Sequence, residues 1–281
     1  MSRNRDRVGG TQHQDASPPP QQTDTNHFAF VVPTEFVELP SQGKFYPEGH
    51  ALRGVDTVEI RHMTAREEDM LTSRTLLKKG VALDRVIQSL IIDKSINPDT
   101  LLVGDRNAII IATRASGYGN EYNTNVTCPA CGTTQKYDFD LNAAVVYDGG
   151  KRTEMDVTDN EDGTFNVLLP KTNLTTTFRL LTGADEKRFV DGMEIDRKQK
   201  QDRNVTRQLR NIIVAVNGDD SSEGISYLVE NIPSIDSRYL RSAYRLSTPD
   251  IDLTQTFICE ECDHEVDLEV PLSADFFWPD R

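Results

Sequence analysis

The sequence lacks the features of several common classes of protein. It has no run of about 20 apolar residues, the length that a membrane-spanning helix needs, so we expect a soluble chain without membrane contact. Only four of the 281 residues are cysteines, and only one is a tryptophan. Basic residues are outnumbered, with 31 Lys and Arg against 45 Asp and Glu and a formal net charge of −14. Nucleic-acid binding requires clustered Lys and Arg, so this charge favours protein partners with basic surfaces instead.

Sequence motifs of catalysis are missing as well. The chain contains no His-Glu-x-x-His, no Gly-x-Ser-x-Gly and no phosphate-binding glycine loop that ends in Lys-Ser or Lys-Thr. Its many acidic residues are spread over expected helix faces, where contact with solvent is their usual role. We therefore predict that the protein is not an enzyme.

The N-terminal segment is poor in residues that could build a core. Residues 1–27 are rich in Gln, Pro, Asp and Ser and include three consecutive prolines, Pro18 to Pro20. Such a segment cannot bury enough apolar surface to offset the entropy lost on ordering. We predict that residues 1–34 are disordered, and the absence of an apolar stretch indicates that they are not a signal peptide.

All four cysteines lie in two short pairs, Cys128-Pro-Ala-Cys131 and Cys259-Glu-Glu-Cys262. A shift of 131 positions superimposes one pair on the other. The same shift matches further residues without a gap: Asp105 with Asp236, Ala112 with Ala243, and Arg114 with Arg245. A fixed order of features repeated in register predicts a tandem duplication.

Each copy is expected to begin with two strands and a helix start. The first strand ends in Leu-Pro, and the second follows a loop; the matching segments are Leu39-Pro40 with Leu169-Pro170, and 58–60 with 177–180. A Thr followed three residues later by an acidic residue has the form of a capping box. This pattern occurs at Thr64 with Glu67 and again at Thr182 with Asp185.

Two further helices account for most of each copy. Apolar residues spaced i, i+3, i+4 and i+7 predict one helix at 83–91 and its counterpart at 209–216. A third helix is predicted to start at Asp105 and at Asp236. The fold class is therefore α+β: a tandem duplication of a strand hairpin plus three helices, each copy ending in a strand, a Cys-x-x-Cys zinc knuckle and a strand.

These features divide the chain into four parts. After the disordered segment 1–34, the first repeat covers 35–147 and carries the knuckle of Cys128 and Cys131. A polar, acidic, glycine-containing stretch at 148–164 has the composition of a linker. The second repeat covers 165–281 and carries the knuckle of Cys259 and Cys262.

Four thiolates from two knuckles are the ligand set of a closed, tetrahedral zinc site. Neither knuckle supplies enough ligands alone, so we predict that Cys128, Cys131, Cys259 and Cys262 share one structural Zn²⁺ that joins the two repeats. A disulfide within each pair, a redox Cys-x-x-Cys motif, an iron–sulfur cluster and metal-free thiols are the alternatives. A redox motif is expected at the start of a helix, whereas both pairs precede expected strands. His264 could substitute as a ligand, although an exposed turn residue is the simpler interpretation.

The C-terminus contains an aromatic cluster, Phe276, Phe277 and Trp278. Clustered aromatic residues at a chain end either fold back onto the core or anchor a binding partner. We therefore keep these three residues as candidate partner-binding residues.

Several motifs together resemble the T4-like bacteriophage baseplate hub protein family. They are Leu39-Pro-Ser-Gln-Gly-Lys-Phe-Tyr-Pro47, Val58-Glu-Ile-Arg-His-Met-Thr-Ala-Arg-Glu-Glu68, Gly104-Asp-Arg-Asn107 and Cys128-Pro-Ala-Cys131. The resemblance covers about Phe36 to Leu272 and is strongest in the first copy.

This resemblance implies a structural or assembly protein of the baseplate hub of a contractile-tailed phage, found in the virion tail or in the host cytoplasm during assembly. The reducing cytoplasm also favours zinc over disulfides. The implied partners are other tail and baseplate hub proteins, with the tape-measure protein as a further candidate. An alternative is a tail assembly chaperone that leaves the virion. The alternative from another class is a zinc-ribbon adaptor for nucleic acid.

Overall fold

The computed structural model describes residues 31–199, 203–270, 272 and 274–277. By its internal contacts the chain divides into two units, 1–31 and 32–281, and the second unit is described below. The predicted disordered segment therefore lies almost entirely outside the described residues. In the part of the chain that the structure describes, no helix has the length and apolar character needed to cross a membrane.

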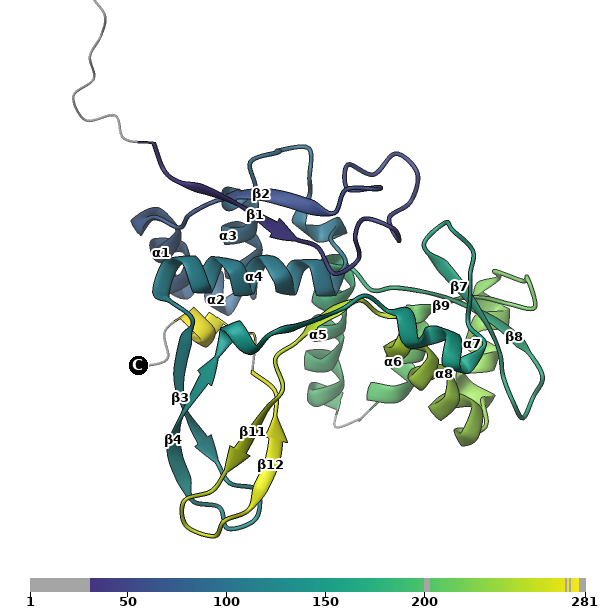
Figure 1. Cartoon of the computed structure of the whole chain (residues 1–281). Helices are drawn as coiled ribbons and strands as arrows, with labels where there is room; N and C mark the ends of the chain where they lie inside the picture. Colours follow the sequence, from purple (N-terminus) through teal and green to yellow (C-terminus); the bar gives the residue numbers. More distant parts are fainter. Residues whose placement is uncertain (1–30, 200–202, 271, 273, 278–281) are drawn as a thin grey trace, which may run out of the picture. The chain divides into compact units, whose positions relative to one another are not determined.

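We keep the names first repeat and second repeat for 35–147 and 165–281, whose duplication stays a prediction. The first repeat begins with an antiparallel hairpin and continues as helices (Figure 1). Its elements are β1 (Thr34–Glu38), β2 (Thr57–Arg61), α1 (Ala65–Thr72), α2 (Arg74–Lys78), α3 (Ala82–Leu90), a 3-10 turn at Pro98–Thr100, α4 (Val103–Tyr118), β3 (Glu121–Thr127) and β4 (Thr134–Asp140). α3 forms where the apolar spacing predicted a helix, and it buries Val86, Ile87 and Leu90. α4 starts two residues before Asp105.

The stretch predicted as a linker is folded. It contains a 3-10 helix at Gly150–Met155 and the short strand β6 (Thr158–Asp159), which pairs with β7 (Thr164–Leu168). Just before it, β5 (Val145–Tyr147) pairs with β10 (Asp250–Asp252) of the second repeat. The hydroxyl of Tyr239 donates to the main-chain oxygen of Met155 at 3.1 Å. This connection is therefore held against the second repeat at both of its ends.

The second repeat contains the remaining strands and helices. They are β7 (Thr164–Leu168), β8 (Thr175–Arg179), α5 (Gly183–Gln199), α6 (Asn204–Ile212), β9 (Ile213–Val216), α7 (Ser222–Asn231), α8 (Ser234–Ser247), β10, β11 (Gln255–Ile258), β12 (Glu265–Leu268) and a 3-10 turn at Ala274–Phe277. β6, β7, β8 and β9 form one antiparallel sheet. A large apolar cluster includes side chains of both repeats, from Val37 to Phe277.

The structure corrects the predicted second helix of this repeat. The helix predicted at 209–216 ends at Ile212, and Ile213 to Val216 continue as β9 against β8. The run of β-branched residues Ile212, Ile213 and Val214 favours an extended strand once an edge of β8 is available. The structure also contains α7, which has no helical counterpart in the first repeat and was not predicted.

Both predicted capping boxes form around a buried carboxylate. The main-chain N–H and the hydroxyl of Thr64 donate to Glu67, and Arg61 binds the same carboxylate with both terminal nitrogens, at 3.1 and 2.6 Å. Burial raises the pKa of Glu67, but hydrogen bonds from Arg61, Thr64 and Ser89 outweigh it and lower the pKa to about 2. In the second repeat, Thr182 and Arg179 bind Asp185 in the same way. The pKa of Asp185 is raised by burial but lowered further by these bonds, also to about 2.

A second pair of buried carboxylates lies in the first turns of α4 and α8. Asp105 in α4 accepts the main-chain N–H and the hydroxyl of Ser41, at 2.9 and 2.6 Å. Asp236 in α8 accepts the main-chain N–H groups of Lys171 and Thr172, at 2.8 and 2.9 Å. Each carboxylate therefore holds the loop that directly follows the Leu-Pro segment of its own repeat.

The start of α4 packs tightly against the second repeat. A Cβ added to Gly104 would lie 2.0 Å from the main-chain oxygen of Pro249, so only glycine fits there. Asn107 donates to the carboxylate of Asp250 at 3.0 Å. Arg106 joins Asp84 of α3 to Glu186 of α5, at 3.1 and 2.6 Å. The Gly104–Asn107 motif is therefore the junction between the repeats.

The Glu67 carboxylate provides a test of the capping box through pH. Its folded pKa lies below the ordinary 4.5, so its stabilisation is complete above about pH 5 and is lost as the pH falls towards 2. Glu67→Gln should lower the free energy of unfolding by about 1–3 kcal/mol at pH 6, and the deficit should shrink at pH 3. Urea unfolding at both pH values measures this, with the exposed Asp69→Asn in the same helix as control. An equal deficit at both pH values would contradict the charged pairing with Arg61.

The close approach at Gly104 predicts a large effect from one methyl group. Gly104→Ala forces backbone against backbone and should cost at least about 1–3 kcal/mol, despite the better helix propensity of alanine. Gly117→Ala is the matched control in the same helix, because its Cβ would meet only the flexible end of Met63 at 3.1 Å. Urea unfolding of both variants checks this, and equal midpoints would show that the junction is not tight.

Candidate metal centre

Two antiparallel hairpins bring the cysteine pairs together. The first consists of β3 and β4, in register from Glu121 with Asp140 to Thr127 with Thr134. The second consists of β11 and β12, in register from Gln255 with Leu268 to Ile258 with Glu265. The hairpins lie side by side with their turns at the same end (Figure 1). We call these four strands and their two turns the hairpin pair.

The two Cys-x-x-Cys turns have the same backbone geometry. In the first, the Cys128 N–H donates to the oxygen of Thr133, and the Gly132 N–H donates to the oxygen of Cys128. In the second, Cys259 bonds His264 and Asp263 bonds Cys259 through the matching atoms. The residue after the second cysteine has positive φ in both, 76° at Gly132 and 53° at Asp263. Each turn therefore aims both of its sulfurs to one side.

The four Sγ atoms lie within 4.8 Å of one another. Cys128 and Cys262 are 3.8 Å apart, and Cys131 and Cys259 are 3.6 Å apart. Tetrahedral coordination with metal–sulfur bonds of about 2.3 Å requires sulfurs about 3.8 Å apart. A disulfide needs about 2.05 Å, and all four cysteines are free thiols. The cluster therefore fits a single metal ion.

The protonation of the thiols also suits a cation. Hydrogen bonds from the side chain and backbone of Thr133 lower the pKa of Cys131 to about 6. The backbone at His264 lowers the pKa of Cys262, but its hydrogen bonds with the neighbouring thiols, together with burial, raise it to about 12. The Cys262 thiol thus resists ionising beside its neighbours, and a bound ion would supply the compensating charge. Four thiolate ligands leave no open position for a substrate, which is the arrangement of a structural site.

The thiols rest on a small apolar cluster of their own. Cys128, Cys259 and Phe257 are buried, and the partly buried side chains of Val126, Tyr137, Val266 and Leu268 surround them. Its buried members are distinct from those of the main core, while Val126, Tyr137 and Leu268 pack against both. Phe257 is its one fully buried ring, 5.5 Å from that of Tyr137. The distal part of the hairpin pair therefore has little apolar burial besides the thiol cluster.

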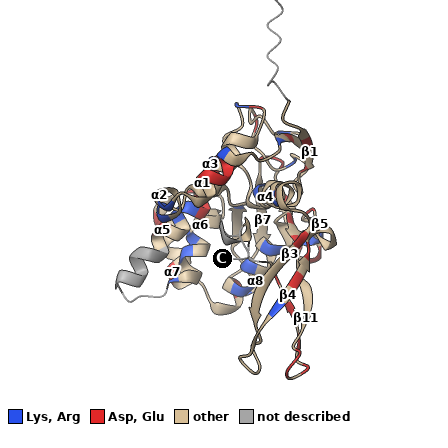
Figure 2. Cartoon of the chain, turned by 90° about the vertical axis from the view of Figure 1, so that its left-hand side faces the viewer, with Lys and Arg blue, Asp and Glu red and all other residues tan. Residues whose placement is uncertain are grey.

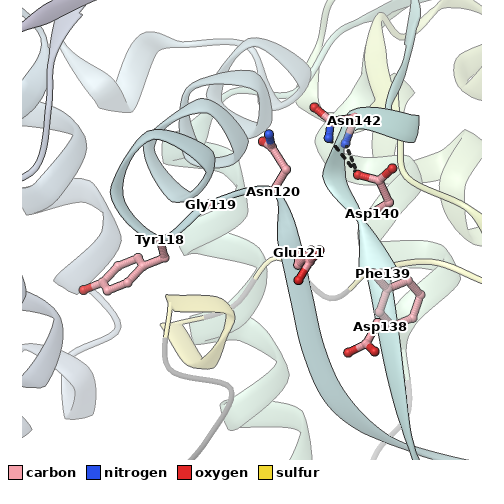
Figure 3. A pocket seen from close by; sticks show the side chains of 8 residues that line it. All are labelled: Tyr118, Gly119, Asn120, Glu121, Asp138, Phe139, Asp140 and Asn142. Carbon is pink, nitrogen blue, oxygen red and sulfur yellow. Dashed lines mark hydrogen bonds between the residues drawn. The ribbon is translucent and has the colours of Figure 1, made fainter.

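The surface of the hairpin pair is strongly acidic (Figure 2). Within residues 121–140 and 255–268, Lys136 is the only Lys or Arg. The exposed carboxylates there are Glu121, Asp138, Asp140, Glu260, Glu261, Asp263, Glu265 and Asp267. Three of them, Glu121, Asp138 and Asp140, line an open pocket of about 620 Å³ beside the end of α4 (Figure 3). Asn142 donates to Asp140 at the rim of this pocket.

The C-terminal aromatic residues fold back onto the core. Phe276 and Phe277 are buried, and their rings contact Tyr122 and Tyr118 respectively. The buried Arg114 donates to the main-chain oxygen of Phe276 at 3.1 Å. Trp278 lies outside the described residues, so a partner contact through this cluster stays a prediction. His264 contributes its main-chain oxygen to the second turn, and its side chain is not part of the thiol cluster.

Sequence reasoning missed the side chains that join the two hairpins. They are Gln135 and Tyr137 of β4 and Gln255 of β11, which bond the opposite hairpin. The sequence feature that could have identified them is the alternation of inward-facing and outward-facing residues along each strand. In β4 and β11 the odd-numbered residues face inward, in line with the cysteines and Phe257.

A comparison with protein families matches residues 32–166 to the family described as T4 bacteriophage base plate protein. The match confirms the resemblance to T4-like phage baseplate proteins over just under half of the chain, from β1 into β7. It implies a structural baseplate protein that has other tail or baseplate proteins as partners and a place in the virion tail. No match was found among curated proteins or among solved structures.

The small apolar cluster beneath the thiols predicts which parts of the protein lose stability when the metal is removed. Cys131→Ser or Cys262→Ser, or a strong chelator, should increase amide hydrogen exchange in both hairpins together, because each contributes two of the ligands. The amides of α4 and α8 should keep their protection, because these helices pack in the main core. Hydrogen exchange followed by mass spectrometry measures this, with Thr124→Ser in β3 as a control that leaves the thiols intact. Loosening of only one hairpin would contradict a shared ion.

Proposed function

We propose that the protein is a non-enzymatic structural or assembly protein of the baseplate hub of a contractile-tailed bacteriophage. The match of residues 32–166 to the T4 base plate family carries this proposal. The closed set of four thiols supports it, because such a site holds a fold together and leaves no position for catalysis. The hub is the finer assignment, and it rests on the motifs at 39–47, 58–68 and 104–107.

We further propose that the ion is one structural Zn²⁺ and that the chain is a duplicated unit. The repeats would be 35–147 and 165–281, joined by 148–164. Sulfur spacing and thiolate ligands favour zinc over harder cations. The matched capping carboxylates, the matched loop-binding aspartates and the two identical knuckle turns support the duplication.

A tail assembly chaperone that leaves the virion is a second candidate. The high net negative charge and the acidic surface of the hairpin pair favour a partner with a basic surface, which is compatible with transient binding. A zinc-ribbon adaptor for nucleic acid is disfavoured by the same surface, because phosphate and carboxylate groups repel each other. Retention on DNA or RNA that weakens with salt would favour this third candidate.

Deletion of the gene from the phage that encodes it tests the proposed role. We expect lysates without complete baseplates by electron microscopy, because a missing hub component or hub assembly factor stops tail construction. Quantitative mass spectrometry of purified wild-type virions then separates the candidates: copies retained in the tail identify a structural component, and absence identifies a chaperone. Normal baseplates in the deletion strain would contradict both.

The metal is tested by elemental analysis of the full chain purified under reducing conditions. We expect one zinc per chain, and a large loss of zinc in Cys128→Ser, whose thiol is buried in the cluster. A serine substitution that spares the thiols, Ala130→Ser in the first turn, should keep the metal if only the thiols matter. Iron in place of zinc, or no metal, would overturn the zinc assignment.

A further inference from the structure

Neighbouring strands of the two hairpins are joined by side chains. β4 belongs to the sheet of β3, and β11 belongs to the sheet of β12. No backbone ladder between β4 and β11 is present among the described strand pairs. Between them run bonds from three side chains, those of Gln135, Tyr137 and Gln255. We call these bonds the glutamine seam.

Each glutamine amide makes the pair of bonds that a neighbouring strand would make. The Gln255 Nε2 donates to the main-chain oxygen of Asp140 at 2.8 Å, and the Asp140 N–H donates to the Gln255 Oε1 at 3.0 Å. The Gln135 Nε2 donates to the oxygen of Ile258 at 3.3 Å, and the Glu260 N–H donates to the Gln135 Oε1 at 2.9 Å. The Gln135 side chain of β4 thus binds the backbone of the second hairpin, and the Gln255 side chain of β11 binds the backbone of the first.

The glutamine seam spans the length of the contact between the hairpins. Gln135 binds the residues on either side of Cys259, so it fixes the second knuckle directly at the thiols. Gln255 binds Asp140 at the opposite end of β4, at the root of the hairpin pair. The Tyr137 hydroxyl donates to the oxygen of Thr256 at 2.8 Å between them. Both glutamines are half-buried, and the bonds that they make lie at the surface of the hairpin pair.

We propose that Gln135 and Gln255 are positioning residues of the metal centre, which hold the two knuckles at the sulfur spacing of a single ion. This inference rests on the proposed zinc site. A site split over two hairpins binds an ion well only in the fraction of molecules whose hairpins are already together, and the apparent affinity falls with that fraction. Residues that orient ligands without touching the metal typically contribute about 10–100-fold in metal affinity.

Zinc affinity of full-length variants, measured under reducing conditions by competition with a chromophoric zinc chelator, tests the proposal. Gln135→Ala and Gln255→Ala should each weaken zinc binding about tenfold or more, and the double variant should bind more weakly than either. Gln88→Ala, at an exposed position of α3, is the matched control and should bind as the wild type does. The melting temperature of the metal-free protein should stay close to the wild-type value in every variant, because neither glutamine is part of the main core.

Two outcomes would overturn the inference and leave the zinc centre standing. One is wild-type zinc affinity in both single variants and in the double variant. The other is a fall in the melting temperature of the metal-free variants that accounts for the whole loss of affinity, which would make the glutamines general stabilisers. A wild-type protein that binds no zinc would overturn the proposed metal centre, and the role of the glutamines with it.

Discussion

The constraint on which this structure depends is that each knuckle has only two thiols. A closed tetrahedral site needs four, so two hairpins separated by more than a hundred residues must stand side by side. Their roots must therefore be placed accurately. The pairing of β5 with β10 does this, because β5 comes shortly after the first hairpin and β10 shortly before the second. The contact of Gly104 with the backbone of Pro249 fixes the start of α4, the helix that leads to β3. The position of the sulfurs is thus determined by packing at the junction as well as by the knuckles.

The main core and the hairpin pair differ in stability. The main core combines helices and strands of both repeats into one apolar cluster. Around the thiols the hairpin pair has one fully buried ring, that of Phe257, whereas its buried Tyr122 and Phe139 belong to the main core. Hydrophobic stabilisation scales with buried apolar area, so the thiol end of the hairpin pair gains little from it and relies on the side-chain bonds of the glutamine seam. Regions with few buried apolar contacts open locally at low free-energy cost. A bound ion would therefore order the thiol end of the hairpin pair, which is less stable than the main core.

Much of the fold could be predicted from the sequence where local chemistry decides the outcome. The capping boxes at Thr64 and Thr182, the helix 82–90 and the convergence of the four cysteines all follow from short-range patterns or from ligand number. The change from helix to strand at Ile213 could not be predicted, because it depends on the free edge of β8, which only the folded sheet supplies. The role of Gln135 was hidden for a similar reason. A half-buried glutamine in an alternating strand has no distinctive signal until the strand beside it is known.

The buried charges show how two weakly similar repeats can be kept to one geometry. Glu67 and Asp185 differ by a methylene group, yet each accepts the N–H and hydroxyl of a threonine and the guanidinium of an arginine. A buried carboxylate without such partners is costly, so a register shift of the preceding strand would be penalised in either repeat. Apolar contacts are less demanding, because many side chains fill the same space at similar cost. The polar positions therefore specify the loop and helix geometry that delivers each hairpin, while the apolar positions remain free to differ.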